Sequence, residues 1–126
     1  MSYKITTTKS FEEVVNSFED IAKEKGFGVL KVYNFTEILK EKGFPIKNEI
    51  AVFEICNPKY AHQVLEKEPS VSMFLPCKIS VMNIDGETEL SMLKPAEVLV
   101  LLKAESVKEI FEEVDVLLKE ILNEFK

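Results

Sequence analysis

The sequence predicts an α+β domain, because stretches of alternating residues and stretches with helical spacing are interspersed along its 126 residues. Two amphipathic helices with capping signals and a hairpin signal near residue 85 support this class. A chain of this length can bury roughly two-thirds of its unfolded surface and needs no disulfide or metal to fold. No linker, repeat or low-complexity stretch divides it, so we expect residues 1–126 to form one domain.

The first elements are a strand and a helix. Residues 3–8 alternate and are rich in Thr, which predicts a strand. Ser10 and Glu13 form a capping box. The helix that follows has an apolar face at helical spacing, made of Phe11, Val14, Val15, Phe18, Ile21 and Ala22. Gly26 is placed to end this helix in a left-handed conformation.

The middle of the chain predicts a strand over residues 29–35, a short helix over 36–42 and a third strand over 49–56. In the third strand, Ala51, Phe53 and Ile55 point one way and Ile50, Val52, Glu54 and Cys56 the other. Asn57 and Pro58 then open another helix, because Asn is a favoured cap and Pro suits the first helical position.

The next segments are extended. Residues 71–75 form a short apolar run that we expect to be extended, and residues 77–84 and 87–93 predict two strands. Asp85-Gly86 between these strands is a hairpin signal. Pro95 starts a short helical segment.

The last helix, residues 106–125, opens on a second predicted capping box, Ser106 with Glu109. Its apolar stripe requires a sheet or a partner subunit to cover it, because burying each large side chain is worth about 1.5–3 kcal/mol. The acidic residues Glu112, Glu113 and Asp115 are expected on its solvated face. The stripe consists of Val107, Ile110, Phe111, Val114, Leu117, Leu118, Ile121, Leu122 and Phe125.

Composition and charge exclude several classes of partner. The net charge is −6, and all 16 basic residues are Lys, so nucleic acid is a poor partner and the bidentate Arg grip on phosphate is absent. Residues 1–8 lack the apolar core of a signal peptide, and the most apolar stretch, residues 98–102, is too short to cross a bilayer. We therefore expect a cytoplasmic protein without membrane contact, whose two cysteines are reduced.

Two Pro-containing segments, Cys56-Asn57-Pro58 and Leu75-Pro76-Cys77, are the only candidate functional site. Cys56 precedes a helix, whose partial positive charge favours a thiolate; alternatively, it is a small buried hydrophobe. Cys77 alternates with Ile79 and Val81, which favours a core position. The two cysteines are 77 − 56 = 21 positions apart, which matches neither a CxxC redox pair nor a zinc ribbon.

Two further side chains could complete this site. Glu54 is the only carboxylate on the Cys56 face of an apolar strand, so it is either solvent-facing or buried with a raised pKa. His62, the only histidine, is either a surface residue or, with Cys56 and Cys77, part of a soft metal site. The tentative ligand-binding residues are Glu54, Cys56, Asn57 and Cys77.

No catalytic set is visible, which favours a non-enzymatic protein and specifies no cofactor. A single His and no nucleophile elbow exclude a Ser-His-Asp triad. Gly26-Phe27-Gly28 lacks the third glycine of a phosphate loop and follows a helix rather than a strand.

With these residues placed, the chain resembles DUF302, a family of domains of unknown function. The resemblance is carried by Cys56-Asn57-Pro58, by Ala61, Leu65 and Pro69, and by Leu75-Pro76-Cys77 with Ile79 and Val81. It covers about residues 3–102, with the helix over 106–125 as an extension. It implies a two-layer fold, in which a mostly antiparallel sheet of about five strands packs on helices, and a homodimer.

Three functions follow as hypotheses. The first is a dimeric sensor that binds a small ligand or a soft metal ion near Glu54, Cys56, Asn57 and Cys77. The second is a structural or protein-interaction module that acts through the last helix. The third is a thiol redox protein, in which Cys56 is the thiolate and Cys77 the resolving partner.

Overall fold

A five-stranded antiparallel sheet, in the order β1-β5-β4-β3-β2, is the frame of the protein. The structure is a computed structural model that describes residues 2–126. The α+β class and the antiparallel sheet are confirmed. The strands are β1 (Ser2–Thr7), β2 (Gly28–Asn34), β3 (Glu49–Cys56), β4 (Cys77–Ile84) and β5 (Glu87–Leu93).

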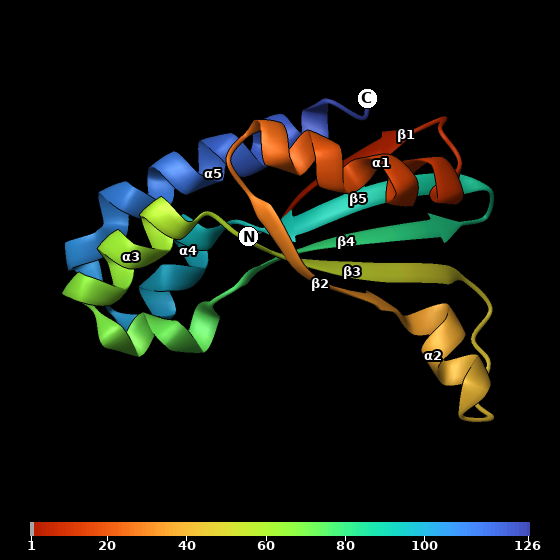
Figure 1. Ribbon diagram of the computed structural model, residues 1–126, viewed down its shortest axis with the longest axis horizontal. Helices are drawn as coiled ribbons and strands as arrows, with labels where there is room; N and C mark the ends of the chain where they lie inside the picture. The colour runs from red at the N-terminus through yellow and green to blue at the C-terminus, as the bar shows by residue number, and fades with distance from the viewer. Residues whose placement is uncertain (1) are drawn as a thin grey trace.

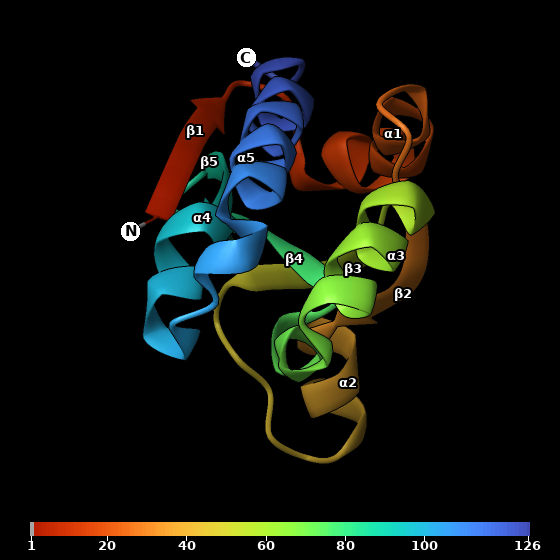
Figure 2. The same cartoon turned by 90° about the vertical axis from the view of Figure 1, so that its left-hand side faces the viewer.

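The helices cover one face of the sheet and both of its ends. Figure 1 shows α1 and α5 above the sheet, α3 and α4 together at one end and α2 at the other, and Figure 2 again places α1 and α5 on one side. No helix among residues 2–126 is long and apolar enough to span a bilayer. The α-helices are α1 (Phe11–Glu24), α2 (Phe35–Glu41), α3 (Pro58–Lys67), α4 (Pro95–Val98) and α5 (Lys108–Asn123), and the 3₁₀ turns are η1 (Pro69–Phe74), η2 (Leu99–Leu102) and η3 (Glu105–Val107).

The core lies between the sheet and the pair α1 and α5. The predicted inward face of β3 is confirmed, since Ala51, Phe53 and Ile55 are all buried. Phe18 of α1 joins the layers: its ring centroid lies 4.2 Å from that of Phe53 and 6.0 Å from that of Phe125. Aromatic pairs at these separations add to the stabilisation from burial alone.

The apolar stripe of the final helix is buried in this core. Phe111, Val114, Leu118, Ile121 and Leu122 are buried on α5, and α5 packs on β1, α3 and α4. The sequence predicts that either a sheet or a partner subunit covers this stripe. In the structure, the sheet and the neighbouring helices of the same chain cover it. These five side chains are therefore covered within the folded chain.

Turn glycines stand where the sequence predicts them. Asp85 and Gly86 have φ angles of 53° and 84°, as the first and second positions of a type I′ hairpin turn require. Gly26, with a φ of 85°, follows α1 and allows the chain to reverse into β2.

Two local predictions are wrong. The run 71–75 is not extended: Pro69 starts the 3₁₀ turn η1, and the Val71 amide donates to the Glu68 carbonyl. A fixed Pro φ near −65° favours such a turn, and it buries Val71 completely. The second capping box is also absent, because α5 begins two residues later and the Ser106 hydroxyl donates to Glu68 Oε1 instead, at 3.1 Å.

Candidate functional site

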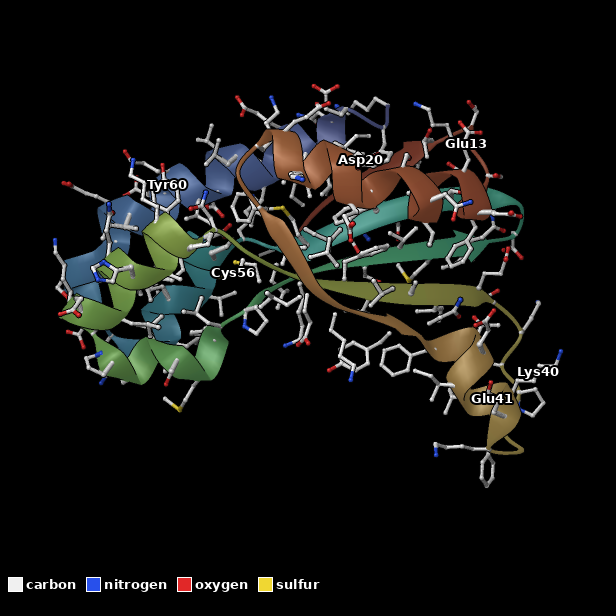
Figure 3. The ribbon with its side chains drawn as sticks, in the orientation of Figure 1. Glu13, Asp20, Lys40, Glu41, Cys56 and Tyr60 are labelled. Carbon is white, nitrogen blue, oxygen red and sulfur yellow. The ribbon has the colours of Figure 1, made fainter. Side chains whose placement is uncertain are left out.

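Cys56-Asn57-Pro58 joins β3 to α3, beside the helical end of the molecule (Figure 3). The Asn57 side chain caps α3, as predicted, by accepting hydrogen bonds from the backbone N–H groups of Lys59 and Tyr60. Its amide also fills the space over Gly26: a Cβ at Gly26 would lie 2.9 Å from Asn57 Nδ2. Asn57 is therefore a structural residue that ties the start of α3 to the corner between α1 and β2.

Leu75-Pro76-Cys77 enters β4, and its Leu75–Pro76 peptide bond is cis. Cys77 is the register partner of Ile55, so the two cysteines lie at the same end of neighbouring strands. Both are free thiols, and both line a small cavity of about 20 Å³. That volume is close to the minimum that holds one water molecule.

The surroundings of both thiols oppose ionisation. Burial raises the pKa of Cys56 above its ordinary value, which opposes the thiolate that a helix terminus would favour. The N-terminal amides of α3 are already satisfied by Asn57, and partial burial prevails. For Cys77, burial, followed by the nearby Cys56 and Asp115, raises the pKa to about 12, against a smaller opposing effect of Lys78. The raised pKa values of both thiols favour the neutral form at pH 7.

Glu54 lies on the opposite side of the sheet, away from α1 and α5. Its Oε2 is 3.6 Å from Lys78 Nζ on β4, and its side chain is 16 % exposed. A hydrogen bond with Glu54 also raises the pKa of the Tyr33 hydroxyl. Alternation along β3 leaves Cys56 on the same side as Glu54, whereas Cys77 pairs with the buried Ile55 on the inner side. The sheet therefore separates Glu54 from Cys77 only.

His62 lies on the surface of α3, apart from the two cysteines. Its side chain is 76 % exposed, and its Nε2 lies 3.9 Å from Glu66 Oε1 one turn along α3. Within residues 2–126, no three His, Cys, Asp or Glu side chains are arranged to hold a metal ion. The structure therefore brings Cys56 close to Cys77 but leaves His62 out of the group.

A second cavity, larger than the first, lies on the other side of Cys77. This cavity of about 170 Å³ sits between the start of β4, η1, the α4 segment and α5. Only Lys78 in its lining is charged. The remaining lining residues are apolar apart from one thiol: Met73, Phe74, Pro76, Cys77, Leu93, Pro95, Val98, Leu99, Phe111 and Leu118.

Asp115 supports one wall of this cavity, and the expectation that it lies on a solvated face is wrong. The backbone N–H of Ala96 donates to its carboxylate, while burial, the largest influence, raises the pKa of Asp115. Its Oδ1 is shielded from solvent and has no hydrogen-bond partner among residues 2–126. Lys94 provides no side-chain cap for α4, so Asp115 supplies a cap from the neighbouring helix. Its position four residues after Phe111 and three before Leu118, on the buried stripe, is the sequence signal for this role.

Residues 3–125 match the family described as "Domain of unknown function DUF302". The chain belongs to the DUF302 family. The match includes α5, so the final helix is part of the DUF302 fold and lies within the family region, beyond the residues 3–102 that carried the resemblance.

A solved DUF302 structure shares the whole architecture. It is the crystal structure of an uncharacterized conserved DUF302 protein from Bacillus stearothermophilus, which is 31 % identical, with a TM-score of 0.94 over 99 % of this chain and 98 % of that one. A search of curated proteins finds no match.

Proposed function

We propose that the protein is a binding protein for a small, largely apolar organic molecule, which occupies the cavity of about 170 Å³ beside Cys77. The observation that carries this proposal is the apolar lining of that cavity. Ligand sites are typically concave and mostly apolar, with few polar groups. An engineered apolar cavity of about 150 Å³ accommodates benzene, so the volume suits a ring or a short alkyl chain.

The neutral thiols and the absence of a metal-ligand cluster among residues 2–126 favour binding over chemistry at this site. Cys77 then serves as a wall between the two cavities, which both include it in their lining. Its polarisable sulfur suits contact with an apolar guest.

Thermal unfolding of the full chain with four six-carbon probes tests the proposal: hexanol, hexanamide, hexanoate and hexylamine. A ligand that binds only the folded state at 100 times its Kd stabilises it by about 2.7 kcal/mol. We expect at least one probe to raise the Tm in a saturable manner and to shift the NMR signals of Val98 and Leu118. If no probe does so at millimolar concentration, the proposal fails.

We also propose that the homodimer forms through the face of the sheet opposite α1 and α5. That face of an antiparallel sheet is usually polar when it meets solvent, yet here it presents Ile50, Val52 and Met82, all half-buried, with Ile84 40 % exposed. A second copy would cover these side chains in an isologous contact. Light scattering should give a dimer for the wild type and a monomer for Ile84→Lys, whereas Val116→Lys, on the exposed side of α5, should leave the dimer intact. A dimer that is lost only in Val116→Lys would return the interface to α5.

A further inference from the structure

The lining of the larger cavity contains one charged side chain, that of Lys78. Lys78 is the only ionisable residue in its lining apart from Cys77, and the Cys77 thiol is neutral at pH 7 because its pKa is about 12. A charged group on a ligand therefore meets a single cation, and no anion in the lining opposes it.

Lys78 is free to change partners. Its side chain is 60 % exposed, and its Nζ lies 3.6 Å from Oε2 of Glu54, whose side chain is 16 % exposed. The lysine end of the pair is therefore open to solvent, while the carboxylate end is shielded. Glu54 keeps a hydrogen bond with the Tyr33 hydroxyl and has Lys31 as its register partner across the sheet. The departure of Lys78 would therefore not leave Glu54 without a polar neighbour.

The interior of the cavity rejects an anion. Its apolar lining offers no partner to a carboxylate, and an unpaired buried charge is very unfavourable. Asp115, which interacts electrostatically with Cys77, adds negative charge behind this wall. A ligand carboxylate must consequently remain at the mouth beside Lys78, with its apolar part inside.

The size of the cavity limits that apolar part. A volume of about 170 Å³ is slightly larger than the engineered cavity of about 150 Å³ that holds benzene. Met73 and Leu93 line the cavity and are also 73 % and 60 % exposed, so they can cover the part of a chain nearest the mouth. A chain of about six to eight carbons fits this space, whereas the two long tails of a membrane lipid do not.

We infer that the cavity is selective for small monocarboxylates, aliphatic or aromatic, of about six to eight carbons, with the tail enclosed and the carboxylate paired with Lys78. This inference rests on the proposed binding function and adds the chemical class of its ligand. Glu54 acts as the competitor that holds Lys78 when the cavity is empty.

Calorimetric titration of the full-length chain with hexanoate and hexanamide, which have the same length, tests the inference. The wild type should bind hexanoate about tenfold more tightly than hexanamide, since a charge-assisted hydrogen bond is about twice as strong as a neutral one. Lys78→Gln should remove this difference by weakening hexanoate alone. Glu54→Gln should strengthen hexanoate about two- to threefold, because it releases Lys78 from its partner.

Lys4→Gln is the matched control, because it changes the net charge equally on an exposed residue of β1 outside the cavity. It should leave the tenfold preference intact. Equal affinities of the wild type for the two probes, or an equal loss of both in Lys78→Gln, would overturn the carboxylate inference while leaving the cavity as a binding site. Failure of both probes, together with hexanol and hexylamine, would overturn the proposed function itself.

Discussion

The two cavities on either side of Cys77 differ in almost every respect, although both include Cys77 and Phe111 in their walls. The small one is bounded by Cys56 and Asn57, the residues that the sequence marks most strongly, yet its volume is only about 20 Å³. The large one, of about 170 Å³, is bounded mostly by ordinary Leu, Val, Phe, Pro and Met side chains.

This contrast shows which kinds of residue can be recognised from the sequence alone. Asn57, Pro58 and Pro76 stand out because helix starts and strand entrances demand particular backbone conformations. A binding cavity makes no such demand on any single residue. It results from three stretches of the chain, within residues 73–78, 93–99 and 111–118, that do not quite fill the space between them.

Filling each cavity in turn is the most severe test of this contrast. Val98→Phe places a ring in the large cavity, so we expect hexanoate affinity to fall about 100-fold or more, while the free energy of unfolding changes by less than about 1.5 kcal/mol. Ala61→Phe, at the small cavity, should do the reverse: a loss of about 1–3 kcal/mol from overpacking, with unchanged affinity in the folded protein. Urea denaturation and calorimetric titration measure the two quantities. Unchanged affinity in Val98→Phe would place the ligand elsewhere.

The reaction rate of the Cys77 thiol provides a second test, because Cys77 lines both cavities. The pKa of Cys77 rises from 9.0 to about 12, which lowers its thiolate fraction at pH 8 by about a thousandfold. The greater nucleophilicity of a high-pKa thiolate recovers part of this, so in Cys56→Ala we expect Cys77 to react with iodoacetamide about 30-fold more slowly than a free thiol. Cys56, measured in Cys77→Ala, should show a smaller slowing. Faster reaction than a free thiol at either position would restore the redox hypothesis.

The sequence was sufficient for the elements whose causes are local. The inward face of β3, the Asp85-Gly86 turn and the Asn57 cap each depend on a few neighbouring residues, and each is confirmed. Residues 71–75 depart from the predicted extended run because burial of Val71 and the turn at Pro69 are set by tertiary packing rather than by β propensity.

The candidate site is predictable only in part, because it depends on contacts between residues that are distant in sequence. The proximity of Cys56 and Cys77 follows from the register of β3 and β4, which the two isolated strand patterns do not fix. The same register separates Glu54 from Cys77, because Cys77 pairs with the buried Ile55 on the inner face. The larger cavity depends on the packing of α4 against α5, for which Asp115 within the apolar stripe was the one visible sign.

Glycine substitutions measure how strongly Asn57 holds the small cavity together. Gly26 and Gly43 have nearly equal φ angles of 85° and 88°, but only Gly26 would place a Cβ against Asn57. Gly43→Ala should cost about 1–2 kcal/mol for the left-handed conformation. Gly26→Ala should cost about 1 kcal/mol more, because Asn57 must move and its cap weakens.

The double variant Gly26→Ala/Asn57→Ala, measured by urea denaturation, serves as the control. If the extra cost of Gly26→Ala comes from Asn57, it should vanish when that side chain is already absent. A cost that persists in the double variant would exclude Asn57 as its cause.

Asp115 provides the smallest and most specific effect, since it supports the large cavity without lining it. Its pKa is raised in the folded protein, so the folded state holds the proton more tightly than the unfolded state and loses stability as the pH rises through that raised value. Asp115→Asn removes this loss and keeps an oxygen to accept from Ala96. At pH 7 we expect it to raise the free energy of unfolding by less than about 1 kcal/mol, because the half-buried carboxylate is partly screened. The advantage should disappear below the ordinary Asp pKa of 3.8.

Asp115→Ala separates charge from capping. It also removes the buried charge, but it leaves the Ala96 amide at the first turn of α4 without its acceptor, which typically costs about 1 kcal/mol. Because α4 forms a wall of the large cavity, hexanoate affinity should fall in Asp115→Ala and be retained in Asp115→Asn. Equal affinities in the two variants would show that the capping of α4 does not shape the cavity, and that Asp115 acts there through its charge alone.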